Sequence, residues 1–259
     1  MHERLSFFVK RDSPIHHLNP MTKVVLALSL VLIAFSSPFY WTPQAIFLLA
    51  IVPLSFIARV AKEYWSFFLK VILPTISFLL VMQALFLPGE SRIVFEIFGL
   101  EVTELSAQLA FRNATRIAVM ISSFTILLLT THPSELMSDL TRRGLPGQFA
   151  YVIIASLQII PQMRAKTQTI ISAQRSRGLD TQSSFFRRVG AIVPLVGPLV
   201  FGSLVEVEER AIAIEARGFT STRLKTSLYE IPDRTSDKVI RWILIILVVI
   251  SVALKLWLS

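Results

Sequence analysis

Residues 189–205 read VGAIVPLVGPLVFGSLV, an apolar run long enough to suggest a membrane span but interrupted at Pro194, Gly197 and Pro198. A second apolar run, residues 149–161, precedes it. The residues between the two runs carry six positive charges, Arg164, Lys166, Arg175, Arg177, Arg187 and Arg188. If both runs crossed the bilayer, these charges would be exported, against the rule that basic loops stay in the cytoplasm. We therefore expect both runs to lie at the cytoplasmic face, and a hairpin of two ordinary spans remains the alternative.

The composition of the whole chain indicates a membrane protein. Of its 259 residues, 53% are hydrophobic, and the mean hydropathy is +0.63. Such values are too apolar for an ordinary soluble domain and predict several spans. The chain has no cysteine, which excludes disulfides, thiol nucleophiles and cysteine-based metal sites.

Five further apolar runs are candidate spans, at about residues 24–41, 43–58, 71–87, 117–131 and 239–258. Several are short of the ~20 residues that a perpendicular helix needs. Asn19-Pro20 precedes the first run, where Asn suits the helix cap and Pro the first helical position. Basic residues without an apolar core occupy the preceding arm, so we expect no cleavable leader, and the first span serves as the anchor.

The charges of the connecting loops predict the orientation of the chain. The arm before the first run holds four Lys or Arg residues, the stretch 32–58 holds none, and residues 88–104 hold one Arg and four Glu. Residues 141–241 then hold fifteen Lys or Arg residues. This alternation places the N-terminus and the segment from about 132 to 238 in the cytoplasm.

The expected fold class is therefore an all-α polytopic membrane protein with about five transmembrane helices. We expect an N-terminal membrane domain at 1–131, a cytoplasmic helical domain at 132–237 and a last transmembrane helix at 238–259. Arg112 and Arg116 fall in the outer half of the fourth helix. They either face the interior of the bundle or belong to an amphipathic lead-in.

Helix signals divide the cytoplasmic segment into three helices. A short helix is expected from Pro133 to near Gly144, a long one from about 148 toward Gly178, with a possible kink at Pro161, and a third from about 184 to Gly218. The prolines and glycine of the run 189–205 predict an interruption in the third helix.

The second and third of these helices end in the same way. Ser172 to Asp180 reads SAQRSRGLD and Ala211 to Phe219 reads AIAIEARGF. Gly178 and Gly218 suit the left-handed position just after a helix, and the apolar residues that follow, Leu179 and Phe219, suit the contact that accompanies it. Arg177 and Arg217 fall in the last turn, where a cation favours the helix dipole. One such end is explained by capping alone.

The repetition of the pattern points to a function beyond capping. Each arginine follows a small residue and has an alanine four positions earlier, so each helix end offers a low surface with one projecting guanidinium. The planar fork of arginine suits a carboxylate or a carbonyl edge. Two similar tips predict two similar sockets on a partner with two similar subunits. The candidate docking residues are Ser176, Arg177, Gly178, Ala216, Arg217 and Gly218, flanked by Ala173, Arg175, Ala213 and Glu215.

The chain resembles the transmembrane coupling subunit, or T component, of energy-coupling-factor ABC importers. The paired motifs Ser176-Arg177-Gly178 and Ala216-Arg217-Gly218 are similar to the family's two Ala-Arg-Gly motifs, with Ser in place of Ala in the first. Asn19-Pro20-Met21-Thr22-Lys23 resembles the family's Asp-Pro-Arg-Thr-Lys stretch, from which it differs at two of five positions. The resemblance covers essentially the whole chain.

This resemblance implies a mechanism and a set of partners. Arg177 and Arg217 would dock into two cytosolic ABC ATPase subunits, a homodimer or a heterodimer. The helices that they end would transmit ATPase movements to a separate substrate-binding membrane subunit, gripped by the apolar runs 149–161 and 189–205. The expected function is uptake of a vitamin, cobalt or nickel across a prokaryotic plasma membrane, without catalysis by this chain. The sequence does not identify the substrate or show whether the module serves one substrate-binding subunit or many.

Several other functions are disfavoured by the residues themselves. Gly197 begins a phosphate-loop-like spacing without the required Lys, and we expect no cofactor. Adjacent His16 and His17 point apart on a helix and predict no metal site. No catalytic residue or nucleophile motif is found, and the acidic cluster at 206–209 is expected to pair locally with Arg210. The basic excess follows membrane topology, so we expect lipid and protein partners and no nucleic acid.

The rival functions make different demands on the sequence. A conventional ABC permease with its own substrate path would carry Glu-Ala-Ala with Gly four residues further on, whereas Glu215-Ala216 is followed directly by Arg217-Gly218. An intramembrane enzyme would need ionisable pairs within its spans. A substrate-binding component would lack the long basic cytoplasmic segment.

Overall fold

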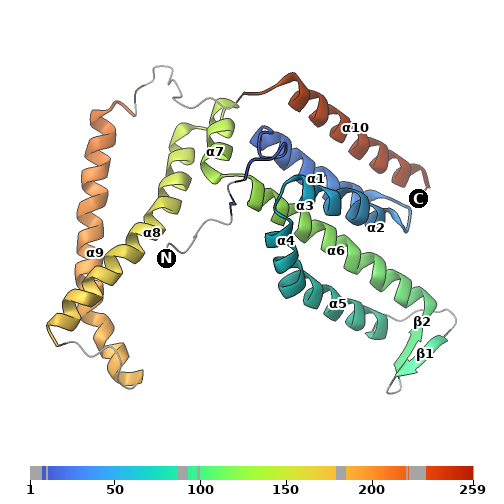
Figure 1. Cartoon of the computed structure of the whole chain (residues 1–259), viewed down its shortest axis with the longest axis horizontal. Coiled ribbons are helices and arrows are strands. Elements are labelled where there is room, and N and C mark those ends of the chain that lie inside the picture. Colours follow the sequence, from blue (N-terminus) through green and yellow to red (C-terminus); the bar gives the residue numbers. More distant parts are fainter. Residues whose placement is uncertain are drawn as a thin grey trace. The chain divides into compact units, whose positions relative to one another are not determined.

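The structure is a computed structural model that describes residues 8–9, 11–86, 93–97, 100–178, 185–219, 221 and 232–258, and only the backbone of 93–97, 100–102 and 185–194 (Figure 1). By its internal contacts the chain divides into two units. The first comprises residues 1–145 and 231–259, and the second comprises residues 146–230.

The first unit consists mainly of apolar helices. Within the described residues, three helices are long and apolar enough to cross a membrane, Ala61–Phe86, Glu104–Thr130 and Thr235–Leu258. Two shorter apolar helical segments cover Pro20–Ser36 and Thr42–Ile57. These five segments follow the order of the five predicted runs, so the all-α polytopic class is confirmed.

In chain order the first unit contains α1 (Pro20–Ser36), α2 (Thr42–Ile46), η1 (Phe47–Ile51), α3 (Val52–Ile57), α4 (Ala61–Phe67), η2 (Phe68–Ile72), α5 (Leu73–Phe86), β1 (Ile93–Ile97), β2 (Leu100–Thr103), α6 (Glu104–Thr130), α7 (Pro133–Arg142) and α10 (Thr235–Leu258). Helix α1 packs against both α6 and α10, and α5 packs against α6. The wide π-helical turns η1 and η2 each come just before a proline, Pro53 and Pro74. Proline cannot donate to the preceding turn, and a widened turn is one way to accommodate that loss.

A short antiparallel hairpin was not expected from the sequence. Strands β1 and β2 pair between α5 and α6, with Ile97 opposite Leu100 and an irregularity between Ile93 and Phe95. They fall within the acidic loop 88–104. The β-branched and aromatic residues of Ile93–Ile97 favour a strand.

The helix starts follow the predicted capping chemistry. Asn19 caps α1 by accepting a hydrogen bond from the Met21 backbone N–H, with Pro20 at the first helical position. His132 caps α7 in the same way, accepting from the Ser134 N–H ahead of Pro133. Both predicted helix starts are confirmed.

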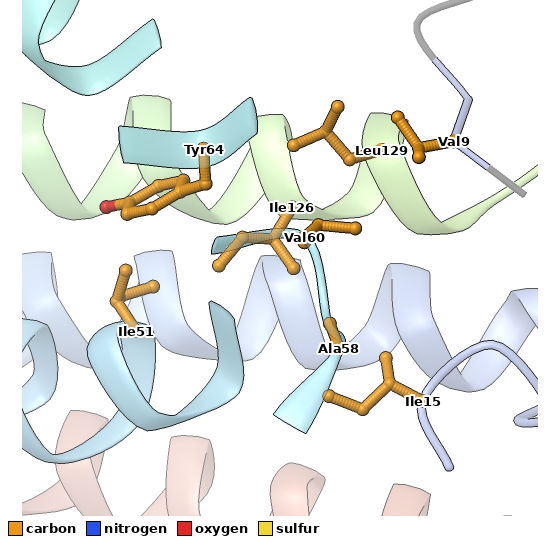
Figure 2. Close-up of a cluster of buried hydrophobic side chains, with 8 residues drawn as sticks. All are labelled: Val9, Ile15, Ile51, Ala58, Val60, Tyr64, Ile126 and Leu129. Atoms are coloured by element: carbon orange, nitrogen blue, oxygen red, sulfur yellow. The ribbon is translucent and has the colours of Figure 1, made fainter. Parts of the chain in front are cut away.

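In the buried core of the first unit, side chains of the N-terminal arm pack with side chains of η1, α4 and α6 (Figure 2). The arm contributes Val9 and Ile15, and the turn between α3 and α4 contributes Ala58 and Val60. Tyr64 is fully buried and donates its hydroxyl to Ser122 Oγ of α6, at 2.9 Å. The remaining members are Ile51, Ile126 and Leu129.

The second unit consists of two long helices, α8 (Gly147–Ser176) and α9 (Phe185–Ala216). The predicted interruption of the third cytoplasmic helix is wrong, because α9 runs without a break through Pro194 and Pro198. Helix α8 likewise continues through Pro161. A proline removes only one backbone donor from a helix, and the many remaining bonds of a long helix keep it continuous.

Candidate functional site

The two arginine–glycine tips end α8 and α9. At the α8 tip, Gly178 has φ +90° and donates its N–H to the Arg175 carbonyl at 2.9 Å. At the α9 tip, Gly218 has φ +70° and donates to the Glu215 carbonyl at 2.9 Å. The predicted left-handed glycines are confirmed at both tips. The predicted apolar contact of Leu179 lies outside the described residues.

The α9 tip is a complete helix-ending motif. The Phe219 N–H donates to the Ile214 carbonyl at 3.2 Å, the bond across six residues that accompanies a left-handed glycine. The Phe219 ring then packs on Tyr151 at the start of α8, with ring centroids 5.3 Å apart. Backbone hydrogen bonds and the contact with α8 therefore hold the tip and fix the position of the Arg217 backbone.

The predicted docking residues are exposed at both tips. Ser176, Arg177, Ala216 and Arg217 are all exposed, and so are the flanking residues Ala173, Arg175, Ala213 and Glu215. Within the part of the chain that the structure describes, no acidic side chain forms an ion pair with Arg177 or Arg217. Both guanidiniums therefore keep their donors for water or for a partner.

A third arginine–glycine end shows what a purely structural version looks like. Helix α7 ends at Arg143-Gly144, with Gly144 at φ +112°. Here the Arg143 Nε donates to Asp139 Oδ2 at 2.9 Å, and a terminal nitrogen reaches Asp233 Oδ2 at 3.5 Å. The nearer partner, Asp139, lies four residues before Arg143, where Arg177 and Arg217 each have an alanine, whereas the second partner, Asp233, is 90 residues away along the chain.

Contacts between α8 and α9 show that the two helices run in opposite directions (Figure 1). Tyr151 meets Phe219, Arg210 donates to Gln162 Oε1 at 3.3 Å, and Lys166 bridges to Glu206. The residue numbers of these contacts increase along α8 and decrease along α9, as in an antiparallel pair. Arg217 therefore lies near the start of α8, whereas Arg177 follows Tyr151 by about 26 residues of helix. At 1.5 Å per residue the two tips are about 40 Å apart.

Glu206 belongs to the bridge between the helices rather than to an exposed local pair. It does approach Arg210, as expected, but only at 3.9 Å. The hydrogen bond from Lys166 is the main reason why the pKa of Glu206 lies below its ordinary value, and the nearby positive charges add to this effect. The sequence missed this bridge because its partners are 40 residues apart.

A groove between the two helices adjoins the α9 tip. Its volume is about 400 Å³, and its polar lining is Tyr151 and Gln158 from α8 and Arg210 and Arg217 from α9. Ile154, Ala155, Ala213 and Ile214 form its apolar walls. One of the two tips thus combines a guanidinium with a concave surface.

Both helices expose large apolar side chains, α8 within residues 149–160 and α9 within residues 196–212. On α8 these are Phe149, Val152, Ile153, Leu157 and Ile160. On α9 they include Val200, Phe201, Leu204, Val205 and Ile212. Contiguous exposed apolar surface of this kind is typical of contact with lipid or with another protein.

Arg116 has a contact that the sequence left open. Its Nε donates to the Ala34 carbonyl at 3.0 Å, and its guanidinium lies 5.7 Å from the centre of the Phe35 ring. It therefore faces the last turn of α1, where unsatisfied carbonyls attract a cation. Among the described residues, no cluster of His, Asp and Glu is arranged to hold a metal ion.

Comparison with known proteins identifies the family. The cobalt transport protein (CbiQ) family model matches residues 11–228. The chain is 32% identical to the energy-coupling factor transporter transmembrane protein EcfT of Leuconostoc gelidum subsp. gasicomitatum, over 97% of this chain and 96% of the relative. It is 31% identical to EcfT of Limosilactobacillus fermentum, over 97% of both chains, and 29% identical to EcfT of Thermanaerovibrio acidaminovorans, over 98% and 96%.

These matches cover nearly the full length of the chain, from the capped start of α1 through both arginine–glycine tips. They agree with the apolar helices of the first unit. The chain therefore belongs to the EcfT/CbiQ family of transmembrane components of energy-coupling factor transporters.

Proposed function

We propose that this chain is the non-catalytic coupling subunit of an energy-coupling factor ABC importer in the plasma membrane of a prokaryote. Its tips Ser176-Arg177-Gly178 and Ala216-Arg217-Gly218 dock into two cytosolic ABC ATPases, which hydrolyse the ATP. The observation that carries this proposal is the pair of exposed guanidiniums, without ion pairs among the described residues, at opposite ends of an antiparallel helix pair.

The geometry of the helix pair suits two ATPase subunits. The tips are about 40 Å apart along α8, so one globular socket would not engage both easily, whereas two subunits of a dimer would. The Lys166–Glu206 bridge and the Tyr151–Phe219 contact join the two helices. Movement of one ATPase against the other would therefore tilt or spread α8 and α9 as a connected pair.

The apolar faces of α8 and α9 would then act on a separate substrate-binding membrane subunit. They expose the side chains that such a contact needs, from Phe149 on α8 to Phe201 on α9. The proposed cargo is a vitamin or a transition-metal ion, and the name of the matching family model, cobalt transport protein, supports the metal ion. The N-terminus and both tips would be cytoplasmic, as the distribution of basic residues predicts.

Co-purification with the partner ATPases tests the docking. The chain would be expressed with the ATPases encoded beside it, as wild type and as Arg177→Glu and Arg217→Glu, singly and together. Arg164→Glu is the matched control, because Arg164 is also exposed on α8 but lies away from the tip. We expect the wild type and the control to retain ATPase and the double variant to lose it. Equal ATPase retention in the wild type, the control and all variants would show that the two arginines only cap their helices.

A further inference from the structure

A partly buried polar cluster joins the starts of α1 and α10 to the end of α7. Its members are Asn19, Asp139, Arg143, Asp233, Asp237 and Arg241, and we call it the base cluster. All six belong to the first unit. The cluster lies where the chain leaves that unit after Leu145 and where it returns at Ile231.

Asn19 is the point at which three helices meet. Besides capping α1, it donates its side-chain Nδ2 to Asp139 Oδ1 of α7, at 3.4 Å. Its backbone N–H donates to Asp237 Oδ1 of α10, at 3.2 Å. The residue is fully buried. One asparagine therefore uses its carbonyl, its amide and its backbone to fix the relative positions of α1, α7 and α10.

The two buried carboxylates are each held by more than one donor. Asp139 is 2% exposed and also accepts from Arg142 at 3.0 Å and from Arg143 at 2.9 Å. Asp237 is 1% exposed and accepts a second bond from the Arg234 N–H at 3.3 Å, which caps α10. Buried charges of this kind are tolerated only with their partners in place, so the cluster resists partial opening.

Asp233 connects the residues just before the segment 146–230 to those just after it. It accepts two bonds from Arg241, at 2.7 and 2.8 Å, and it lies 3.5 Å from a terminal nitrogen of Arg143. Arg143 is two residues before Leu145, and Asp233 is two residues after Ile231. The Arg143–Asp233 contact thus ties together the two ends of the segment 146–230, which carries both tips.

We propose that the base cluster is a fixed joint that passes movement of the segment 146–230 to the membrane helices α1 and α10, with Arg143 and Asp233 as its positioning residues. The inference rests on the proposed coupling function. If the ATPases move the segment 146–230, this movement reaches the membrane helices α1 and α10 only when the two ends of the segment are firmly attached to them. The cluster meets that need with hydrogen-bonded charges, which hold a fixed geometry where apolar contacts would slide.

Asp233→Asn tests the joint while sparing the buried carboxylates. It weakens the pairs with Arg143 and Arg241, and Asp233 is itself one-fifth exposed. In the full complex reconstituted with its ATPases and substrate-binding subunit, we expect unchanged ATPase retention and ATP hydrolysis. Substrate uptake per ATP hydrolysed should fall by about fivefold or more. Asp233→Glu should restore part of the lost substrate uptake per ATP. Glu63→Gln, which breaks the Arg11–Glu63 pair elsewhere in the first unit, is the matched control and should leave the ratio unchanged.

A cross-link tests whether the joint stays closed. The chain has no cysteine, so Arg143→Cys/Asp233→Cys can be joined specifically with a short bifunctional thiol reagent. We expect the reagent to restore uptake to this double variant, because it replaces the lost pair. Loss of uptake on cross-linking would show that the ends must separate and would overturn the proposal.

The outcomes separate this inference from the proposed function. Wild-type complex without bound ATPase would refute the docking function itself. Retained ATPase with an unchanged uptake ratio in Asp233→Asn would overturn only the fixed joint. A fall in the amount of assembled complex, with a normal ratio in what assembles, would also overturn it, since the cluster would then serve folding alone.

Discussion

At the scale of single residues, the three arginine–glycine ends differ in what surrounds each guanidinium. Arg143 is engaged by two aspartates, whereas Arg177 and Arg217 project without an ion pair among the described residues. The sequence predicted the glycine conformations correctly because they depend on local capping. The sequence also places Asp139 four residues before Arg143, where the other two arginines have an alanine, but the contact of Arg143 with Asp233 exists only in the folded chain.

Arg217→Ala should weaken ATPase binding without harming the fold. If the guanidinium enters a socket and pairs with a buried carboxylate, its loss costs about 2–5 kcal/mol of binding. Arg217→Lys should recover only part, because an ammonium lacks the planar fork. Titration of purified ATPase onto the reconstituted chain measures the change. An affinity of Arg217→Ala within a factor of about two of the wild type, well under 1 kcal/mol, would contradict docking by this residue.

Gly218→Ala should destabilise the α9 tip through the backbone alone. An added Cβ would meet only Ser221 Cβ, at 4.0 Å, so there is no clash. The positive φ of Gly218 costs an L-residue about 1–2 kcal/mol. Gly202→Ala is the matched control: it lies within α9 with open space around it, and alanine there should be neutral or stabilising by up to about 1 kcal/mol. Thermal unfolding in detergent would compare them, and equal midpoints would contradict a strained tip.

At the scale of elements, the sequence predicted the helices better than their interruptions. Capping at Asn19 and His132 and the order of the apolar runs follow from local chemistry. The predicted break in α9 is wrong, because the remaining backbone hydrogen bonds of this 32-residue helix keep it continuous through its prolines. The Lys166–Glu206 bridge was missed because it forms only when α8 and α9 pair.

This bridge predicts a pH-dependent spread of the helix pair. The pKa of Glu206 is lowered in the folded chain, mainly by its hydrogen bond from Lys166. The bridge therefore stabilises the pair at pH values above the ordinary pKa of 4.5 and loses that contribution as the pH falls through the lowered value. Spin labels at positions 177 and 217 should report a distance of about 40 Å at neutral pH, with a broader distribution at pH 3 than at pH 7. Lys166→Met is the control and should be broad at both pH values. A wild-type distribution that is the same at both would contradict the bridge.

At the scale of the whole molecule, loop charge decides between two topologies. The proposal keeps the segment between the apolar runs 149–161 and 189–205 in the cytoplasm, while the alternative hairpin exports it. Because the chain has no cysteine, Arg164→Cys and Glu104→Cys give single labelling sites on the two expected sides. In intact cells, a membrane-impermeant maleimide should label Glu104→Cys and not Arg164→Cys. Labelling of Arg164→Cys from outside would establish the hairpin.

The family could be predicted from the sequence because its signature is local and repeated. The base cluster could not, since Asn19, Asp139 and Asp233 meet only in the folded chain. Under the two proposals together, the chain would receive movement at two exposed arginines and pass it to membrane helices.

The most direct test of this account is a cross-link from each tip to a separate ATPase. Photoreactive side chains would replace Ala173 and Ala213, which lie one helical turn before Arg177 and Arg217. The account predicts that each probe alone captures one ATPase protomer and that a chain carrying both captures two. Capture of the substrate-binding subunit in their place, or no capture from an assembled complex, would contradict docking at the two tips.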